Sequence, residues 1–289
     1  MPGNLLSPTE VKRILASHGL RPKKRLGQNF LIDRNVLRKI LDAAELDPSS
    51  LVLEIGPGLG ALTREAALAA AKVVAVEVDR NLIPVLQETV GDLDNVEIVA
   101  ADFLELDLPE FLSSRFGERR CIVLANLPYY ITSPLITKLM DTANRIERMV
   151  IMVQEEVAQR LTAMPGSRDY GSLTVLVQYH CSVRIVAHVK RTVFYPPPEV
   201  DSAIVRLDVR QAPPVSVPDE AFFFRIVRAS FGQRRKTLLR SLSGSPELGW
   251  TRQRAEEVLS GAGIDPVRRG ETLSLEEFAA ITRKALNRE

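Results

Sequence analysis

Short apolar runs alternate with longer stretches of helical periodicity through the first half of the chain. The runs predict strands at residues 51–55, 73–78, 96–100, 121–125 and 149–153. Between them, stretches such as 62–71 and 80–90 have the pattern of amphipathic helices. Consecutive runs start roughly 25 residues apart, which is typical of the strand–helix units that build a parallel sheet. The pattern therefore predicts an α/β fold with a doubly wound sheet.

The second half of the chain changes character after residue 209. Before it, apolar runs at 173–178 and 202–209 predict two more strands that complete the sheet, one of them as an antiparallel hairpin. After it, the segment QAPPVSVPD carries three prolines, and helical periodicity follows to the end. We therefore expect an N-terminal helix and basic arm (1–25), an α/β domain (26–212) and a small all-helical domain (213–289).

Composition excludes several classes of protein. With 289 residues, 45% of them hydrophobic, the chain can bury a full core. No apolar run approaches the roughly 18 residues of a membrane span, and the N-terminus lacks an apolar signal region, so we expect a cytoplasmic protein without membrane contact. The two cysteines have no C-x-x-C spacing and the three histidines are scattered, which predicts no metal site. Nothing in the sequence requires more than a monomer.

Positive charge is concentrated in two segments, although the net charge is only +2. Residues 11–32 and 221–246 each contain six basic residues and no acidic one. These residues are Lys12, Arg13, Arg21, Lys23, Lys24 and Arg25 in the first segment, and Arg225, Arg228, Arg234, Arg235, Lys236 and Arg240 in the second. Such clusters often only cover a solvated face, but two of them on a nearly neutral chain favour a polyanionic partner.

A glycine loop follows the first predicted strand, in LVLEIGPGLGALT. Gly56, Gly58 and Ala61 fit the loose pattern G-x-G-x-x-[GA] of nucleotide-binding loops. Glu77 stands 21 residues after Gly56 at the end of the next predicted strand, where a carboxylate binds ribose hydroxyls. Asp102 follows the third strand and is placed to accept the amino group of an adenine, although taken alone it is an ordinary helix N-cap.

The loop favours S-adenosylmethionine over a dinucleotide as the cofactor. Pro57 and the E-x-G-x-G-x-G form suit a sulfonium compound without phosphates, and Glu54 adds a negative charge that would disfavour a pyrophosphate. An NAD-linked oxidoreductase stays an alternative, but no catalytic acid or hydride-positioning group accompanies the loop.

The stretch ANLPYYITSP, at residues 125–134, follows the fourth predicted strand. Carboxyl ends of strands are where ligands bind in open α/β sheets, and Pro128 restricts the backbone of this loop. We expect the Asn126 side-chain oxygen and the carbonyl of Leu127 or Pro128 to accept the N–H groups of an adenine amine, with Tyr129 stacked on the flipped base. The plain alternative is a strand-to-helix turn with a capping Asn and core tyrosines.

The whole motif order resembles the ribosomal RNA adenine N6,N6-dimethyltransferases, particularly the bacterial small-subunit enzymes. The motifs are GQNFL, EIGPGLGALT, VEVD, ADFLEL, NLPYYITSP, FYPPPEVDSAIVRL and FGQRRKTL, and they span nearly the whole chain. The resemblance implies a Rossmann-like domain that uses S-adenosyl-L-methionine and methylates two adjacent adenosines in the 3′-terminal hairpin loop of small-subunit (16S) rRNA. It implies cofactor contacts from Asn29, Leu31, Gly56, Gly58, Glu77, Asp102 and Asn126, and target-base contacts from Asn126, Leu127, Pro128, Tyr129 and Phe194.

The resemblance also implies RNA contacts from the basic segments and the small ribosomal subunit as partner. The residues are Lys23, Lys24, Arg25, Arg234, Arg235 and Lys236. One departure is Arg240, where similar proteins often carry an amide; an added positive charge suits RNA contact. Alternatives are a large-subunit rRNA adenine methyltransferase of the macrolide-resistance type, a DNA adenine methyltransferase, and a non-catalytic RNA-binding assembly factor.

Overall fold

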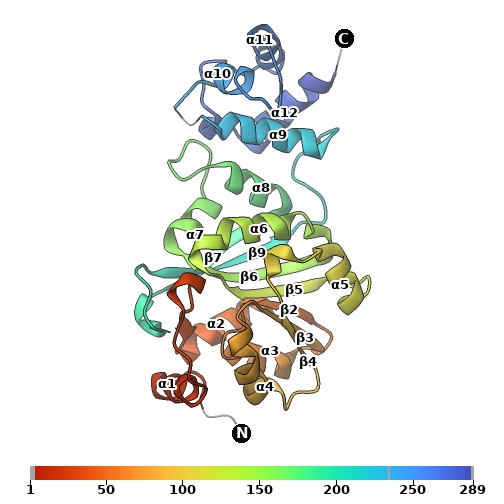
Figure 1. Cartoon of the computed structure of the whole chain (residues 1–289). Coiled ribbons are helices and arrows are strands. Elements are labelled where there is room, and N and C mark those ends of the chain that lie inside the picture. The colour runs from red at the N-terminus through yellow and green to blue at the C-terminus, as the bar shows by residue number, and fades with distance from the viewer. Residues whose placement is uncertain (1–3, 234, 288–289) are drawn as a thin grey trace. The chain divides into compact units, whose positions relative to one another are not determined.

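The computed structural model describes residues 4–233 and 235–287, which form two compact units (Figure 1). The first unit contains the chain up to Ala158 together with Ser182–Val209. The second contains Gln159–Cys181 together with the chain from Arg210 onward. The chain therefore passes from the first unit to the second, returns to the first for Ser182–Val209, and leaves again.

A mixed sheet forms the centre of the first unit. Its strands, in spatial order, are β4 (Val96–Ala100), β3 (Lys72–Glu77), β2 (Leu51–Ile55), β5 (Cys121–Asn126), β6 (Ile146–Gln154), β9 (Ser202–Val209) and β7 (Cys181–Val189). The pairs β4–β3, β3–β2, β2–β5 and β5–β6 are parallel, and β9 runs antiparallel to β6. The predicted doubly wound, Rossmann-like fold is confirmed.

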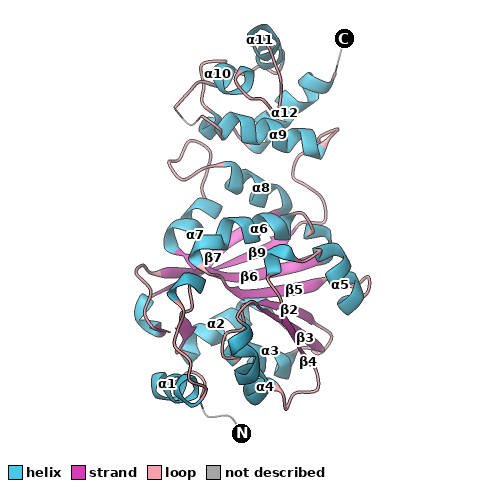
Figure 2. Cartoon of the chain, viewed as in Figure 1, coloured by secondary structure: helices cyan, strands magenta, loops and turns pink. Residues whose placement is uncertain are grey.

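Helices cover both faces of this sheet (Figure 2). They are α2 (Arg34–Ala44), α3 (Ala61–Ala69) and α4 (Ile83–Val90) on one face, and α5 (Leu108–Phe116) and α6 (Thr132–Met140) on the other. Because both faces are covered, β2 is buried along its whole length and β5 up to its last residue. This burial explains why these strands read as continuous apolar runs instead of alternating ones. The remaining helix, α1 (Pro8–Ser17), belongs to the N-terminal arm.

The second unit is helical and has its own apolar core. Its helices are α8 (Ser172–His180), α9 (Glu220–Phe231), α10 (Leu238–Ser243), α11 (Arg252–Gly261) and α12 (Leu275–Leu286), while α7 (Glu155–Leu161) spans the boundary between the units. Phe223 and Phe278 are fully buried in this core, and Tyr179 of α8 stacks beside Phe223. No regular element lies between Val209 and Glu220, the proline-rich segment.

The strand predicted at 173–178 is wrong, because this segment is helix α8. Thr174 supports its first turn by accepting the backbone N–H of Gly171, and Val175 packs into the helical core. A short apolar run fits a buried helix as well as a strand, and packing decides between them. The same packing places 159–181 with the C-terminal helices, whereas the sequence-based division kept them in the α/β domain; the boundaries at 25 and 212 stay predictions.

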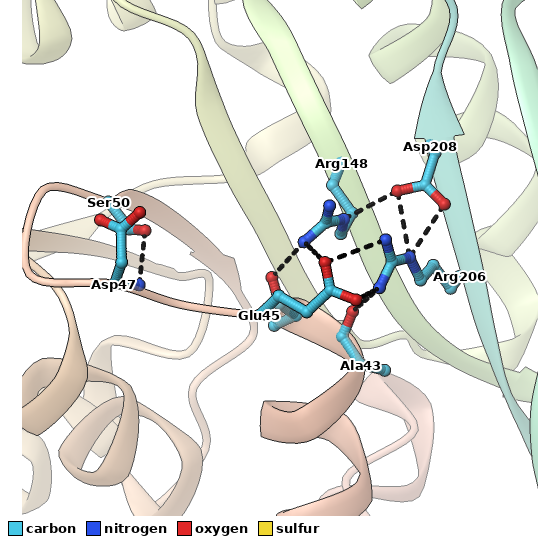
Figure 3. Close-up of polar contacts among 8 residues, drawn as sticks. Ala43, Glu45, Asp47, Ser50, Arg148, Arg206 and Asp208 are labelled. Atoms are coloured by element: carbon cyan, nitrogen blue, oxygen red, sulfur yellow. Dashed lines mark hydrogen bonds and ion pairs between the residues drawn. The ribbon is translucent and has the colours of Figure 1, made fainter.

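An ion-pair network fastens the end of α2 to β6 and β9 (Figure 3). Arg148 of β6 lies 2.7 Å from Asp208 of β9 and 3.0 Å from Glu45, which follows α2. Arg206 of β9 lies 2.8 Å from Asp208 and also contacts Glu45. Both guanidinium groups donate to the last carbonyls of α2, at Ala43 and Ala44, where positive charge is favourable. The network thus holds α2 against the sheet.

Replacing Arg206 by Met should lower the free energy of unfolding by about 2 kcal/mol, because Met cannot replace the charged hydrogen bonds that the buried Arg206 donates to Glu45 and Asp208, although both acids keep Arg148. Urea unfolding of the purified variant measures this loss. Arg38→Met is the matched control: Arg38 also pairs with an acid, Asp42, but both are exposed and 3.7 Å apart, so we expect a change of at most about 0.5 kcal/mol. Equal losses in the two variants would contradict the structural role of the network.

Candidate active site

The active-site pocket lies where the strand order reverses, between β2 and β5. The chain moves outward from β2 to β3 and β4, then returns to the other side of β2 as β5. Ile55 and Ala125 are paired in the parallel register, so the loops after both strands leave the sheet at the same edge. Ligands bind at this position in open α/β sheets. A pocket lies there, lined by residues that follow β2 and β5 and by residues of the N-terminal arm.

Glycines shape the wall of the pocket that follows β2. Gly56 and Gly58 have φ angles of +73° and +60°, a region that side chains rarely adopt. A Cβ on Gly58 would lie 3.3 Å from the Phe30 ring, so this position is also restricted by packing. The loop therefore brings bare backbone to the pocket surface and allows a ligand to approach closely.

Two buried carboxylates, Glu54 and Glu77, line the pocket. Glu77 accepts hydrogen bonds from the backbone N–H of Asp79 at 2.8 Å and of Gly58 at 3.3 Å, which fixes its orientation at the end of β3. Glu54 is 2% exposed, and among the described residues its Oε2 atom has no hydrogen-bond partner. Burial raises the pKa of each carboxyl to about 7, and for Glu54 the charge of Glu77 adds to the effect. The pocket thus favours a ligand that supplies positive charge or N–H groups.

The N-terminal arm closes one side of the pocket. Lys23 forms a 2.7 Å ion pair with Asp79, and Gln28 donates to the same carboxylate at 2.8 Å. Burial alone would raise the pKa of Asp79, but the hydrogen bonds from Lys23 and Gln28 outweigh it and lower the pKa. Asp79 therefore stays charged and ties the arm to the end of β3.

A single hydrogen bond connects this arm to the loop after β5. Asn126 donates from Nδ2 to the Asn29 carbonyl at 3.1 Å. The donor nitrogen is thereby held toward the arm, and the structure gives Oδ1 no donor within the described residues. Asn126 consequently presents an acceptor oxygen from a fixed side chain at the edge of the pocket.

The backbone of the same loop offers one further acceptor. The Leu127 N–H donates to the Met152 carbonyl, which anchors the loop to β6. The Pro128 carbonyl already accepts two hydrogen bonds, from the Ile131 N–H at 3.2 Å and the Thr132 hydroxyl at 3.0 Å. Sequence reasoning left the Leu127 and Pro128 carbonyls as alternatives, and these contacts favour Leu127.

Tyr129 is held by its hydroxyl group, which lies 2.7 Å from the Ser202 hydroxyl at the start of β9. Its ring is half-buried, and burial raises the pKa of the phenol, so the hydroxyl stays protonated near neutral pH. The ring orientation beside Asn126 is therefore fixed by a hydrogen bond across two strands.

Of the predicted site residues, most line the pocket and four do not. The pocket lining includes Asn29, Leu31, Gly56, Gly58, Glu77, Asn126 and Pro128, with Leu127 and Tyr129 beside them in sequence. Asp102 does not line the pocket; it caps the 3₁₀ turn Phe103–Glu105 by accepting the Leu104 N–H at 2.9 Å. Phe194 is 3% exposed and packs into the core around α2, so stacking on a base would require its side chain to move. Both roles stay predictions.

Sequence reasoning missed several lining residues. Gln28, Leu5 and Met152 line the pocket although no local motif marks them. Leu5 and Gln28 come from the arm, and the chain position of an arm does not reveal which edge of a sheet it covers. The GQNFL motif was the only available signal for Gln28.

The predicted RNA-binding cations differ in their surroundings. Lys24 and Arg25 are exposed beside the pocket-lining residues Leu26 and Gly27, whereas the ammonium group of Lys23 is occupied by Asp79. In the second unit, Arg235 and Lys236 line a surface hollow together with Arg240 and Arg252, and its lining contains no acidic residue. Arg234 lies outside the described residues. Arg252 was missed because it follows Glu247, beyond the acid-free segment.

Within residues 4–233 and 235–287, no group of His, Cys, Asp and Glu side chains has the arrangement of a metal site. In the same part of the chain, every helix is too short or too polar to cross a membrane.

The fold and the pocket define a Rossmann-like methyltransferase, and comparisons with known proteins give the family. A model of the family described as "Ribosomal RNA adenine dimethylase" matches residues 19–281, and the chain belongs to this family. The chain is 53% identical over 287 residues to the ribosomal RNA small subunit methyltransferase A of Pelotomaculum thermopropionicum, with 97% of each chain covered. It is 50% identical to the protein of the same name from Moorella thermoacetica, covering 97% of this chain and 98% of that one.

Solved structures agree with this assignment. A dimethyladenosine transferase from Plasmodium falciparum is 27% identical with a TM-score of 0.73, covering 87% of this chain and 95% of that one. The 23S rRNA methyltransferase ErmE is 30% identical with a TM-score of 0.66, covering 89% of this chain and 99% of that one. The predicted family and enzyme class, an rRNA adenine dimethyltransferase, are confirmed.

Replacing Glu54 by Gln should remove a pH-dependent loss of stability. Below its ordinary pKa of 4.5, Glu54 is neutral in both the folded and the unfolded chain. Between pH 4.5 and about 7, the unfolded chain releases the proton and the folded one retains it, so the wild-type protein loses stability as the pH rises, by up to roughly 3 kcal/mol. Urea unfolding at pH 5 and pH 8 should show Glu54→Gln gaining relative to wild type only at pH 8.

The control for this prediction is Glu118→Gln, because the Glu118 side chain is 90% exposed. We expect this variant to follow the wild-type pH dependence. A Glu54→Gln curve parallel to the wild-type curve would show that the buried carboxyl is not the source of the pH effect.

Proposed function

We propose that this enzyme uses S-adenosyl-L-methionine to dimethylate N6 of two adjacent adenosines in the 3′-terminal hairpin loop of small-subunit rRNA during ribosome biogenesis. The observation that carries the proposal is the pair of acceptors at the edge of the pocket, Asn126 Oδ1 and the Leu127 carbonyl. Membership of the rRNA adenine dimethylase family supports the chemistry. The small-subunit name of relatives at 50–53% identity supports the substrate, against 30% identity to the 23S enzyme.

The residues present fit the proposed cofactor. The positive φ angles of Gly56 and Gly58 expose backbone for close approach, and Glu77 at the end of β3 is placed to accept ribose hydroxyls. Glu54 offers a buried carboxylate oxygen without a partner among the described residues, as the cationic part of the cofactor requires. When bound, S-adenosylmethionine supplies an electrophilic methyl group on a sulfonium sulfur.

The chain's own residues act mainly by positioning the adenine. The amine of adenine is a weak nucleophile because its lone pair is delocalised into the ring. Asn126 Oδ1 and the Leu127 carbonyl accept its two N–H groups, which favours a pyramidal nitrogen whose lone pair points into the pocket. Tyr129, held by Ser202, stacks on the base after it leaves the RNA helix or loop. Positioning of this kind requires no strong general base.

Transfer of labelled methyl groups to isolated undermethylated subunits tests the substrate. We expect incorporation into small subunits and none above background into large subunits. Incorporation into large subunits alone would favour the macrolide-resistance type of activity. Binding to small subunits without any transfer would favour a non-catalytic assembly factor.

Replacing Asn126 by Ala should lower the single-turnover rate of methyl transfer to small subunits at least about 100-fold, the usual cost of losing one positioned polar group in a reacting site. Cofactor binding, measured by titration calorimetry, should weaken but remain detectable, because Gly56, Glu77 and Glu54 are unchanged. Asn35→Ala removes an exposed amide from α2 and should leave the rate unchanged. Unchanged turnover in Asn126→Ala would overturn the mechanism.

A further inference from the structure

Tyr130 is an exposed aromatic side chain immediately after the target-base loop. Its side chain is 58% exposed, whereas Tyr129 beside it is half-buried and hydrogen-bonded. The proposed mechanism gives Tyr130 no role. A large aromatic surface left in water is unfavourable unless a partner covers it.

Hydrogen bonds within its turn and close packing of Gly27 both restrict the backbone at Tyr130. Residues Tyr129–Ile131 form a 3₁₀ turn, and the Thr132 hydroxyl donates to the Pro128 carbonyl at 3.0 Å. Gly27 of the N-terminal arm packs closely against this turn. A Cβ placed on Gly27 would lie 3.1 Å from Pro128 Cβ and 3.7 Å from the Tyr130 ring. The ring is therefore presented from a braced turn at the rim of the pocket, which Gly27 and Pro128 both line.

Positive charge lies on the arm segment that immediately precedes Gly27. Arg25, two residues before Gly27, is exposed, and no ion pair of its side chain is found within the described residues. Burial and the charge of Asp102 raise the pKa of the Tyr130 phenol, whereas the charge of Arg25 lowers it. Lys24 adds a second exposed cation on the same turn.

An aromatic face with adjacent cations matches the chemistry of single-stranded nucleic acid. Bases stack on exposed aromatic rings whatever their sequence, and Arg or Lys neutralises the adjoining phosphate. When one adenine is flipped into the pocket, its neighbour in the strand loses a stacking partner. Tyr130 follows Tyr129 in the loop and is thus placed to receive that neighbour.

We propose that Tyr130 and Arg25 form a second nucleotide subsite, in which Tyr130 stacks on the base next to the target adenine and Arg25 binds its phosphate. The subsite rests on the proposed function, because it presupposes that an adenine in RNA enters the pocket. The subsite would contact the RNA and not the cofactor. Its loss should therefore change the KM for small subunits and leave the Kd of the cofactor unchanged.

The test compares Tyr130→Leu, Tyr130→Phe and Arg25→Gln in steady-state methyl transfer to undermethylated small subunits. Tyr130→Leu should raise KM at least fivefold, the lower limit for losing one base–aromatic stack. Tyr130→Phe keeps the aromatic ring, so its KM should equal that of wild type. Arg25→Gln should raise KM and reduce the salt dependence of subunit binding by about one charge. The cofactor Kd by calorimetry should stay within twofold of wild type in all three variants.

Leu68→Ala is the control, because it removes another exposed apolar side chain, 71% exposed on α3. An unchanged KM in Tyr130→Leu would overturn the subsite, as would an equal loss in Tyr130→Phe, which would assign the effect to the hydroxyl. A parallel loss of cofactor affinity would assign Tyr130 a merely structural role. Absence of transfer by the wild-type enzyme would instead refute the proposed function.

Discussion

Neighbouring parallel strands β2 and β5 end at the same edge of the sheet, and every contact in the active site starts from that pairing. Ile55 lies opposite Ala125, so the glycine loop and the Asn126 loop emerge side by side although the β3 and β4 units separate them in the chain. The wall proposed for the cofactor and the acceptors proposed for the target amine thereby come from the ends of adjacent strands. The two loops keep fixed starting points because the paired strands β2 and β5 that precede them are buried.

The N-terminal arm lines the pocket together with the loops that leave the sheet. Lys23 and Gln28 secure it to Asp79, and its Asn29 carbonyl receives the Asn126 amide. This hydrogen bond joins the arm to the residue proposed to hold the target amine. Burial in the same pocket raises the pKa of Glu54 and Glu77. We expect a positively charged ligand to offset that cost.

The strands and loops of the first half could be predicted because their physical causes are local. Buried parallel strands require continuous apolar runs, and Gly56 and Gly58 mark backbone angles that other residues rarely adopt. Segment 173–178 could not be assigned in this way, since its apolar residues pack equally well as a helix, and contact with α9 decides the outcome. The family resemblance supplied Asn29 and Leu31, which composition and spacing alone would not have indicated.

Other features depend on contacts between distant segments. The choice between the Leu127 and Pro128 carbonyls follows from the donors Ile131 and Thr132, and a sequence pattern does not show which lone pairs are occupied. Lys23 is one of a run of basic residues, yet Asp79, 56 positions later, neutralises it. Arg252 joins the basic hollow only through the packing of the helical unit.

Identification of the modified nucleoside tests the central claim most directly. Small subunits methylated by the enzyme would be digested with nuclease, and the products analysed by mass spectrometry. Acceptors that hold an exocyclic amine predict N6,N6-dimethyladenosine at two neighbouring positions near the 3′ end of the RNA. Methyl groups on a ring nitrogen or a ribose oxygen would contradict the role of Asn126 and Leu127.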